Sequence, residues 1–272
     1  MGHAGPASGH TFDVDTSVRA VGENRFAADV TDRWNALGGG PNGGYSLGIC
    51  LRALGQVLPF PDPLAVSAHF LRPGVPGSAE VRTETIRAGR RLATGQASLI
   101  QAGKEVLRVV ADFTDLTTAA GPTAVFAAAP DLPPPDEAVD LTAGGGIPGV
   151  TITDRVEYRA AQTPGWVLGK PSGLPQAEFW MRFADGRNAD PLSLCFLVDA
   201  AAPVVLEIGQ RSMTIALSVH VRARPVPGWL ACRVATRYLI DGYHEEDFEI
   251  WDTTGKLVAQ SRQLALIPTR AP

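Results

Sequence analysis

Two stretches of the sequence decide the fold: "SAHFLRPGVPG" at 67–77 and "SVHVRARPVPG" at 218–228. They begin 218 − 67 = 151 residues apart and are written in nearly the same letters. Because the side chains of a β-strand point alternately to its two faces, every second residue of a half-buried strand is apolar. Both copies follow this rule at equivalent positions, which are Val66, Ala68 and Phe70 in the first and Leu217, Val219 and Val221 in the second. The chain therefore contains an internal repeat, and each copy includes a strand with one buried face.

The repeat continues on both sides of these strands. Each strand is preceded by an apolar stretch of helical character, "GGYSLGICLRALGQVL" at 43–58 and "DPLSLCFLVDAAAP" at 190–203. Each is followed by a hairpin pattern with Gly-Lys at its turn, at 103–104 and 255–256. A helix that is apolar nearly all round must be surrounded by protein. A curved antiparallel sheet wrapped around one central helix is the simplest arrangement that buries it.

The domain organisation follows from this repeat and from one interruption. The 272 residues suffice for one large domain or for two of about 130 residues. A segment rich in Pro, Gly and Ala, "APDLPPPDEAVDLTAGGGIPG", predicts a linker that crosses the surface. We predict an N-terminal unit at 12–125, a linker at 126–149 and a C-terminal unit at 150–272. The first dozen residues are expected to form a loose tail, and they lack the pattern of a signal peptide.

The composition argues against several classes of protein. A net charge of −4 without clustered basic residues does not favour nucleic-acid binding. No run of about 20 apolar residues is present, so membrane insertion is not expected. The wide spacing of Cys50, Cys195 and Cys232 predicts no zinc site and no disulfide framework, but buried thiols in a reducing cytoplasm. The Gly-rich stretch at 38–44 lacks the Lys-Ser/Thr ending of a nucleoside-triphosphate loop.

Several phrases resemble the acyl-CoA thioesterase II-like family of the double hotdog thioesterase superfamily. In the first half the likeness is carried by "SAHFLRPG", with "GK" about thirty residues later. In the second half it is carried by "FLVDAAAP", "MTIALSVHVRARP", "GWL" and "GKLVAQSRQ". The resemblance covers most of the chain beyond the first 25 residues, except the linker. It implies an α+β double hotdog fold, in which two tandem units each have a curved antiparallel β-sheet wrapped around a central α-helix.

The resemblance also implies an activity and a site. In that family a carboxylate on the second central helix, a hydroxyl on the following strand and an amide on the last strand position a water for attack on a thioester. Matching the motifs implies Asp199, Thr214 and Gln263 in these roles, acyl-CoA or a related acyl thioester as substrate, and no metal or cofactor. The segment that carries Thr214 departs from the family pattern in its polar positions. Ser218 therefore remains an alternative for the hydroxyl.

The residues themselves give these positions independent support. Asp199 interrupts an apolar helical stretch, and its first-half equivalent is Arg52, so the repeat does not require an acid there. Gln263 falls in the less polar row of its strand, whereas Gln260 and Arg262 point the other way, and its first-half equivalent is about Ala111. Each also has a plain structural interpretation: a carboxylate near a helix end that reaches solvent, and a buried amide paired with backbone. Thr214 falls in the more polar row with Ser218, and threonine is a favoured strand residue in any case.

Substrate-binding residues are predicted in two groups. Gly43 and Gly44 permit close backbone approach at a helix start, where free N–H groups can polarise a thioester carbonyl, or they simply form a tight turn. Arginines are expected to meet the phosphates of coenzyme A in a groove between the units; the residues considered are Arg72, Arg90, Arg91, Arg222 and Arg224.

Three histidines need a separate interpretation. His69 and His220 are candidates for substrate binding, but their equivalent places in the repeat favour a structural role where the halves meet. The "HEED" run at 244–247, which contains His244, is interpreted as a solvated strand end rather than a metal site.

Two other functions stay open from the sequence. A hotdog hydratase or dehydratase would use an Asp and a His a few residues apart on one loop, whereas Asp62 and His69 are separated by a strand. A non-catalytic acyl-binding or assembly module would leave Asp199 pointing into solvent. Further association into a homo-oligomer is plausible, since exposed sheet edges invite pairing.

Overall fold

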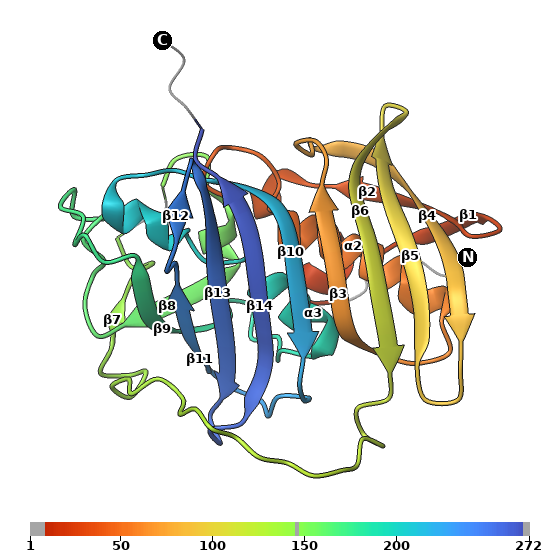
Figure 1. The fold of residues 1–272 in the computed structure, drawn as a ribbon. Helices are drawn as coiled ribbons and strands as arrows, with labels where there is room; N and C mark the ends of the chain where they lie inside the picture. Colours follow the sequence, from red (N-terminus) through yellow and green to blue (C-terminus); the bar gives the residue numbers. More distant parts are fainter. Residues whose placement is uncertain (1–8, 145–146, 269–272) are drawn as a thin grey trace, which may run out of the picture.

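The computed structural model describes residues 9–144 and 147–268 and contains one antiparallel sheet of 14 strands (Figure 1). The first half contributes β1 (Arg19–Gly22), β2 (Arg25–Val30), β3 (Asp62–Phe70), β4 (Gly77–Ala88), β5 (Ala93–Gln101) and β6 (Lys104–Thr114). The second half contributes β7 (Val139–Asp140), β8 (Val156–Ala160), β9 (Gln176–Phe183), β10 (Met213–Val221), β11 (Leu230–Ala235), β12 (Leu239–Ile240), β13 (Tyr243–Asp252) and β14 (Leu257–Leu266). The helices are α1 (Thr11–Asp15), α2 (Gly43–Val57), α3 (Pro191–Leu197) and three 3₁₀ turns, η1 (Asp32–Trp34), η2 (Ile152–Asp154) and η3 (Val204–Ile208).

The repeated phrase forms the centre of the sheet. β3 pairs with β10 antiparallel, and Ser67 lies opposite Ser218, so each copy of the phrase pairs with the other. Outward from this pair the strands follow in matching order, β3-β6-β5-β4-β2 on one side and β10-β14-β13-β11-β9 on the other. Val66 and Leu217 are buried, which confirms the inward-facing apolar rows predicted from the sequence.

The two buried helices lie against one face of the sheet (Figure 1). α2 is capped at its start by Asn42, whose side chain accepts a hydrogen bond from the Tyr45 N–H (2.9 Å). The helix packs on β4, β5 and β6. α3 begins with a capping box between Asp190 and Ser193 and contacts α2, β3, β10 and β14. The helix predicted within 190–203 is thus shorter than expected. After Leu197 the chain forms turns, in which the Asp199 N–H donates to the Phe196 carbonyl oxygen (2.9 Å) and the Ala200 N–H to the Leu197 carbonyl oxygen (3.2 Å).

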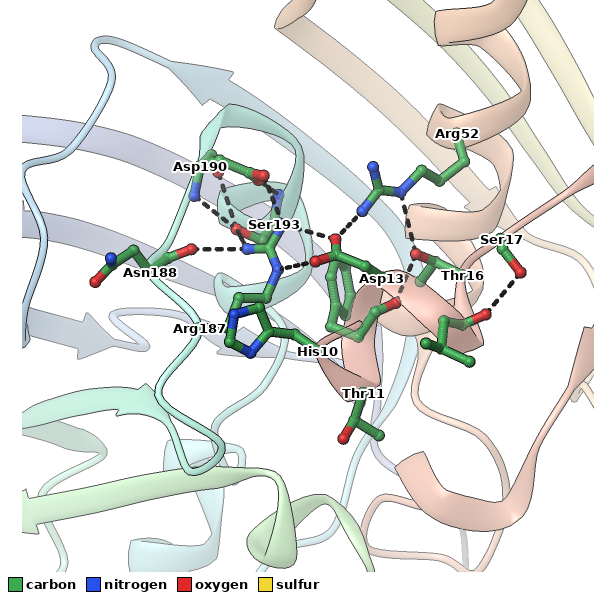
Figure 2. A network of polar contacts seen from close by, with 12 residues as sticks. His10, Thr11, Asp13, Thr16, Ser17, Arg52, Arg187, Asn188, Asp190 and Ser193 are labelled. Carbon is green, nitrogen blue, oxygen red and sulfur yellow. Dashed lines mark hydrogen bonds and ion pairs between the residues drawn. The ribbon is translucent and has the colours of Figure 1, made fainter. Parts of the chain in front are cut away.

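The prediction of a loose tail over the first dozen residues is wrong at its end. Phe12 in α1 is fully buried, and its ring packs on Phe196 (5.1 Å between centroids) and Trp34 (5.6 Å). The next residue, Asp13, accepts hydrogen bonds from Arg52 and Arg187 (Figure 2). α1 is therefore part of the core, while residues 1–8 lie outside the described part of the chain.

The predicted linker crosses the surface and is tied to the second half. It contains the short strand β7, which pairs with β8. The Trp180 indole N–H donates to the Pro133 carbonyl oxygen (2.8 Å), and the Arg159 guanidinium donates to the Pro135 carbonyl oxygen (2.7 Å). Residues 145–146 of this segment lie outside the described residues.

Two further features concern the chain as a whole. The three cysteines are buried and unpaired. Within residues 9–144 and 147–268, no helix is both long and apolar enough to cross a membrane.

Candidate active site

A cavity of about 670 Å³ opens between the two halves of the chain. The first half contributes the start of α2 and the loop after β3, and the second half contributes the segment after α3 and the facing parts of β8, β9, β10, β13 and β14. Asp199, Thr214 and Gln263 all line it. The structure thus brings the three predicted catalytic residues together from three different elements.

Asp199 lies just after α3 and faces the start of α2. Its Oδ2 accepts hydrogen bonds from the Gly44 N–H (2.7 Å) and from Asn42 Nδ2 (3.1 Å). Asn42 Nδ2 also donates to the Asp199 carbonyl oxygen (2.7 Å), so one amide holds both the side chain and the backbone of the acid. Asn42 could be predicted from sequence as a helix N-cap, but not as the partner of a residue 157 positions away.

Gly43 and Gly44 permit this close approach, as the sequence predicted. A Cβ on Gly44 would lie 2.8 Å from the Phe196 carbonyl oxygen and 2.9 Å from the Asp199 Cβ. A Cβ on Gly43 would lie 2.7 Å from the Phe70 ring. The Gly44 N–H, however, is occupied by Asp199, so the expectation that it polarises a carbonyl is wrong. In the described part of the chain the Gly43 N–H has no hydrogen-bond acceptor, and Gly43 lines the cavity.

The environment of Asp199 favours proton exchange near neutral pH. Burial raises the pKa of this carboxyl to about 6, although the hydrogen bonds from Gly44 and Asn42 act in the opposite direction. A carboxylate with such a pKa can take a proton from a bound water and return it within one reaction.

Thr214 reaches the cavity because of a β-bulge. The sequence phase placed it in the same row as Ser218, which faces away from the core. In the structure the register shifts between Thr214 and Ala216, so Thr214 lies opposite buried Ala265 while Ala216 lies opposite exposed Leu264. The Thr214 hydroxyl donates to Gln263 Oε1 (3.0 Å). Ser218 is exposed and does not line the cavity, so of the two alternatives the geometry selects Thr214.

Gln263 connects Thr214 to a buried carboxylate that the sequence interpretation missed. Gln263 Nε2 donates to Glu246 Oε1 (2.9 Å), and Glu246 Oε2 accepts from the Val204 N–H (2.8 Å). Glu246 is 6% exposed and lines the cavity. The interpretation of "HEED" as a solvated strand end is therefore wrong for His244 and Glu246. Strand alternation contained the signal, since both share a face with Phe248.

Glu246 is also electrically linked to Asp199. Burial raises the pKa of Glu246 to about 7, the negative charge of Asp199 adds to this effect, and the hydrogen bonds from Val204 and Gln263 oppose it. The cavity therefore holds two carboxyl groups that disfavour simultaneous ionisation.

The predicted substrate-binding residues divide into two sets. Arg72 lines the cavity, and its guanidinium donates to the Glu105 carbonyl oxygen (2.6 Å). His69, His220 and Arg222 are exposed and do not line the cavity, so the geometry does not support the prediction that they bind substrate there. The histidines lie on the outer face of β3 and β10, because their strands turn the apolar row inward.

The other arginines considered for the phosphates also lie away from this cavity. Arg224 forms an ion pair with Asp62 (2.7 Å). Arg90 and Arg91 are exposed in the turn between β4 and β5.

Comparison with known protein families matches each half of the chain to one domain of a single family. The profile of the acyl-CoA thioesterase C-terminal domain matches residues 128–267, and that of the acyl-CoA thioesterase N-terminal domain matches residues 30–114. An uncharacterised protein of Mycobacterium tuberculosis is 26% identical over 272 aligned residues, which cover 90% of this chain and 91% of that protein. The thioesterase-like protein TwmA of Talaromyces wortmannii is 23% identical, with 98% of this chain and 94% of that protein covered.

Solved structures agree in fold. A Thermobifida fusca protein assigned to thioesterase II superposes with a TM-score of 0.85 at 30% identity and covers 96% of this chain and 98% of its own. A hot dog fold protein from Alicyclobacillus acidocaldarius also gives a TM-score of 0.85, at 22% identity, with 97% of this chain and 100% of its own covered. The sheet is thus that of a hotdog fold, and the chain belongs to the acyl-CoA thioesterase family.

Proposed function

We propose that this protein hydrolyses acyl-CoA thioesters to a free acid and coenzyme A, using Asp199, Thr214 and Gln263. The observation that carries the proposal is a single cavity in which Asp199, held by the start of α2, shares the walls with the hydrogen-bonded pair Thr214 and Gln263. The proposal includes two tandem hotdog units at 12–125 and 150–272, each with a central helix, joined by the linker. It also includes a cytoplasmic role in fatty-acid metabolism, which the unpaired buried cysteines fit.

The reaction begins with a water bound between Asp199 and the Thr214 oxygen. As the water oxygen attacks the thioester carbon, Asp199 accepts one of its protons. Thr214 donates its own proton to Gln263, so its oxygen remains free to accept a hydrogen bond from the same water. The Gly43 N–H and the positive end of α2 stabilise the oxyanion of the tetrahedral intermediate. When the C–S bond breaks, the thiolate of coenzyme A takes the proton back from Asp199.

The walls of the cavity suit an acyl chain at one end and a nucleotide at the other. Tyr158, Phe179 and Phe248 form an aromatic wall in the second half, where an acyl chain would be shielded from water. Arg72 is the basic side chain among the described lining residues, and we assign it to a phosphate of coenzyme A.

The alternative of a hydratase or dehydratase has less support. No histidine is among the lining residues in the described ranges. Asp62 accepts hydrogen bonds from Arg224 and from the Leu116 N–H, and His69 is exposed on the sheet. A non-catalytic acyl-binding module would leave Asp199 pointing into solvent, whereas Asp199 is hydrogen-bonded to the start of α2 and lines the cavity. Such a module would still bind its ligand in this cavity, so a measurement of turnover is needed to separate it from a thioesterase.

The test is thiol release from acyl-CoA thioesters of short, medium and long chain. Thr214→Ala and Ser218→Ala form a matched pair, since both are strand hydroxyls on β10 and only the first lines the cavity. We expect wild-type turnover, a loss of about 10- to 1000-fold in kcat for Thr214→Ala, and no loss for Ser218→Ala. Binding of acyl-CoA without thiol release would favour the binding module. Addition of water to an enoyl-CoA without thiol release would favour the hydratase.

A further inference from the structure

Glu246 is a buried carboxylate of the cavity to which the proposed reaction assigns no task, and it is the one bonded to Gln263. It lies on β13, and each of its oxygens accepts one hydrogen bond, from Gln263 on β14 (2.9 Å) and from the Val204 N–H in η3 (2.8 Å). Gln263 is only 8% exposed, so its amide has little freedom to pair with solvent instead. The carboxylate, the amide and the Thr214 hydroxyl therefore form one chain of hydrogen bonds that ends in the cavity.

The donors and acceptors along this chain can be arranged in only two directions, from Thr214 toward Glu246 or from Glu246 toward Thr214. An ionised Glu246 only accepts, so it draws the Gln263 NH₂ group toward itself and turns the Gln263 oxygen toward Thr214. The Thr214 proton then points to Gln263, and a lone pair of its oxygen points into the cavity. A protonated Glu246 can instead donate to the Gln263 oxygen. The amide is then reversed, its NH₂ group donates to Thr214, and the Thr214 proton is released into the cavity.

We propose that Glu246 is a positioning residue that sets the direction of the chain Glu246–Gln263–Thr214, so that Thr214 offers the attacking water an acceptor and not a proton. This inference rests on the proposed hydrolysis, in which Asp199 takes one proton of the water and the Thr214 oxygen accepts a hydrogen bond from the other. Without the ionised carboxylate, Thr214 would compete with the water as a donor, and the water would be misoriented.

Glu246 has a second link to the site through Val204. The segment from Asp199 to Val204 joins α3 to η3 and lines the cavity. Glu246 holds the far end of this segment by the Val204 N–H, while Asn42 and Gly44 hold its near end at Asp199. A neutral glutamine at 246 can still accept from the Val204 N–H through its oxygen, so it preserves this link and alters only the direction of the chain.

The ionisation of Glu246 connects the chain to pH. The other titratable side chains that line the cavity in the described residues are Arg72, Tyr158, Asp199 and Glu207. Of these, Asp199 acts on Glu246, and its negative charge favours the protonated form. The active state has both carboxyl groups ionised, so activity rises as pH rises through both pKa values and falls below them.

The central variant is Glu246→Gln, because its NH₂ group donates to the Gln263 oxygen and fixes the reversed direction. We expect kcat to fall by about 10- to 100-fold, the effect of losing one charge-assisted hydrogen bond, with KM changed by less than about twofold. The acid limb of the pH profile changes from two ionisations to one. Its midpoint also shifts to lower pH, because the ionisation with the higher pKa, that of Glu246, is lost and that of Asp199 remains. The matched control is Glu245→Gln on the same strand, whose carboxylate accepts from backbone N–H groups at 237 and 238 outside the cavity.

A double-variant cycle separates positioning from a structural role. In a Thr214→Val background the chain has no hydroxyl to orient, so Glu246→Gln should cause no further loss of kcat. Multiplicative losses in the double variant, or a lower unfolding midpoint together with a raised KM in Glu246→Gln, would overturn the proposal.

A spectroscopic readout does not depend on turnover. The side-chain NH₂ resonances of Gln263, identified by their absence in Gln263→Glu, should shift between about pH 5 and pH 9 in the wild type and stay constant in Glu246→Gln. Resonances that do not shift in the wild type would refute the proposal even in an active thioesterase. Resonances that shift as expected in a protein without turnover would refute the proposed hydrolysis and leave the hydrogen-bond direction supported.

Discussion

The two halves of the molecule share a strand order but differ in where their buried helix ends. α2 continues for 15 residues, whereas α3 ends after 7. In the first half the continuation carries Leu54 and Leu58 beneath β5, where a Cβ on Gly95 would lie 3.0 and 3.2 Å from their side chains. In the second half the turns that follow Leu197 leave the equivalent space as the cavity. The early end of α3 thus leaves open a space that α2 and its C-cap fill in the first half.

The polar residues of the cavity follow the same asymmetry. The registers of the two halves correspond, since Leu217 lies opposite Gln263 as Val66 lies opposite Ala111, and a register shift follows Pro63 as another follows Thr214. With this correspondence, the first-half equivalents of Asp199, Thr214, Glu246 and Gln263 are Arg52, Pro63, Gly95 and Ala111. The first half therefore keeps the fold of the repeat but none of its candidate chemistry.

At the position equivalent to Asp199, the first half is covered by α1, whereas in the second half Asp199 lines the open cavity. Arg52, the equivalent of Asp199, pairs with Asp13 of α1, and Asp13 also accepts two hydrogen bonds from Arg187 (both 2.9 Å; Figure 2). Arg187 in turn donates to Asp190 and Ser193 at the start of α3. α1 thus pairs with one arginine from each half and covers the first-half helix, and Phe12 fills the adjoining core.

The largest expected effect comes from removing this closure. Phe12→Ala should lower the free energy of unfolding by about 3 to 5 kcal/mol, because it leaves a cavity among packed aromatic rings. Phe126→Ala is the matched control, since Phe126 is 100% exposed. Chemical denaturation of both variants measures the difference. Equal stabilities would show that α1 does not close the first half, whereas the KM of folded Phe12→Ala should equal that of the wild type.

A smaller effect on the free energy of unfolding is expected from Asp13 of α1, which pairs with Arg52 and Arg187. Burial raises the pKa of Asp13, but the hydrogen bonds and charges of Arg187 and Arg52 outweigh it and hold the pKa below its usual value. A lowered pKa stabilises the fold above the unfolded-state pKa, and this contribution is lost as pH falls through the folded-state pKa. Asp13→Asn should therefore cost about 1 to 2 kcal/mol at neutral pH, limited by the 37% exposure of Asp13.

The pH dependence provides the check on Asp13. The difference in unfolding free energy between the wild type and Asp13→Asn should disappear in acid, once the carboxylate of the wild type is protonated. A difference that stays constant from neutral to acidic pH would mean that the amide disturbs packing rather than charge.

The smallest effect is expected on the outer face of the sheet. His220→Ala and Arg222→Ala should each change KM for acyl-CoA by less than about twofold, because exposed residues away from the cavity contribute little. Arg72→Ala is the comparison, since Arg72 lines the cavity and its loss should raise KM. An equal rise of KM in all three variants would show that coenzyme A also contacts the outer face of the sheet.

Much of this arrangement could be predicted from the sequence. The repeat, the inward apolar rows and the hairpins follow from strand alternation and turn residues, and Asp199 and Gln263 stand out as polar groups in apolar surroundings. Thr214 could not be oriented, because a bulge shifts the alternation by one residue and has no clear signature here. Its cavity position was implied only by the family resemblance.

Other predictions from the sequence were wrong for physical reasons that the structure shows. α1 has only five residues, too few for a helical period, so the sequence did not show that a helix at the boundary between the tail and the N-terminal unit packs into the core. Glu246 was hidden within a charged run, although alternation with Phe248 would have placed it inside. His69 and His220 were candidates for substrate binding, but their strands turn them outward on the β3–β10 pair, where the two halves meet.

The most direct test compares the two equivalent positions, Asp199 and Arg52. Thiol release from an acyl-CoA that the wild type hydrolyses is measured for folded Asp199→Asn and for folded Arg52→Gln. We expect Asp199→Asn to lose about 100- to 10,000-fold in kcat, the usual effect of removing a general base, and Arg52→Gln to stay within a few-fold of the wild type. An undiminished Asp199→Asn, or a larger loss in Arg52→Gln, would contradict the assignment of the chemistry to the second half.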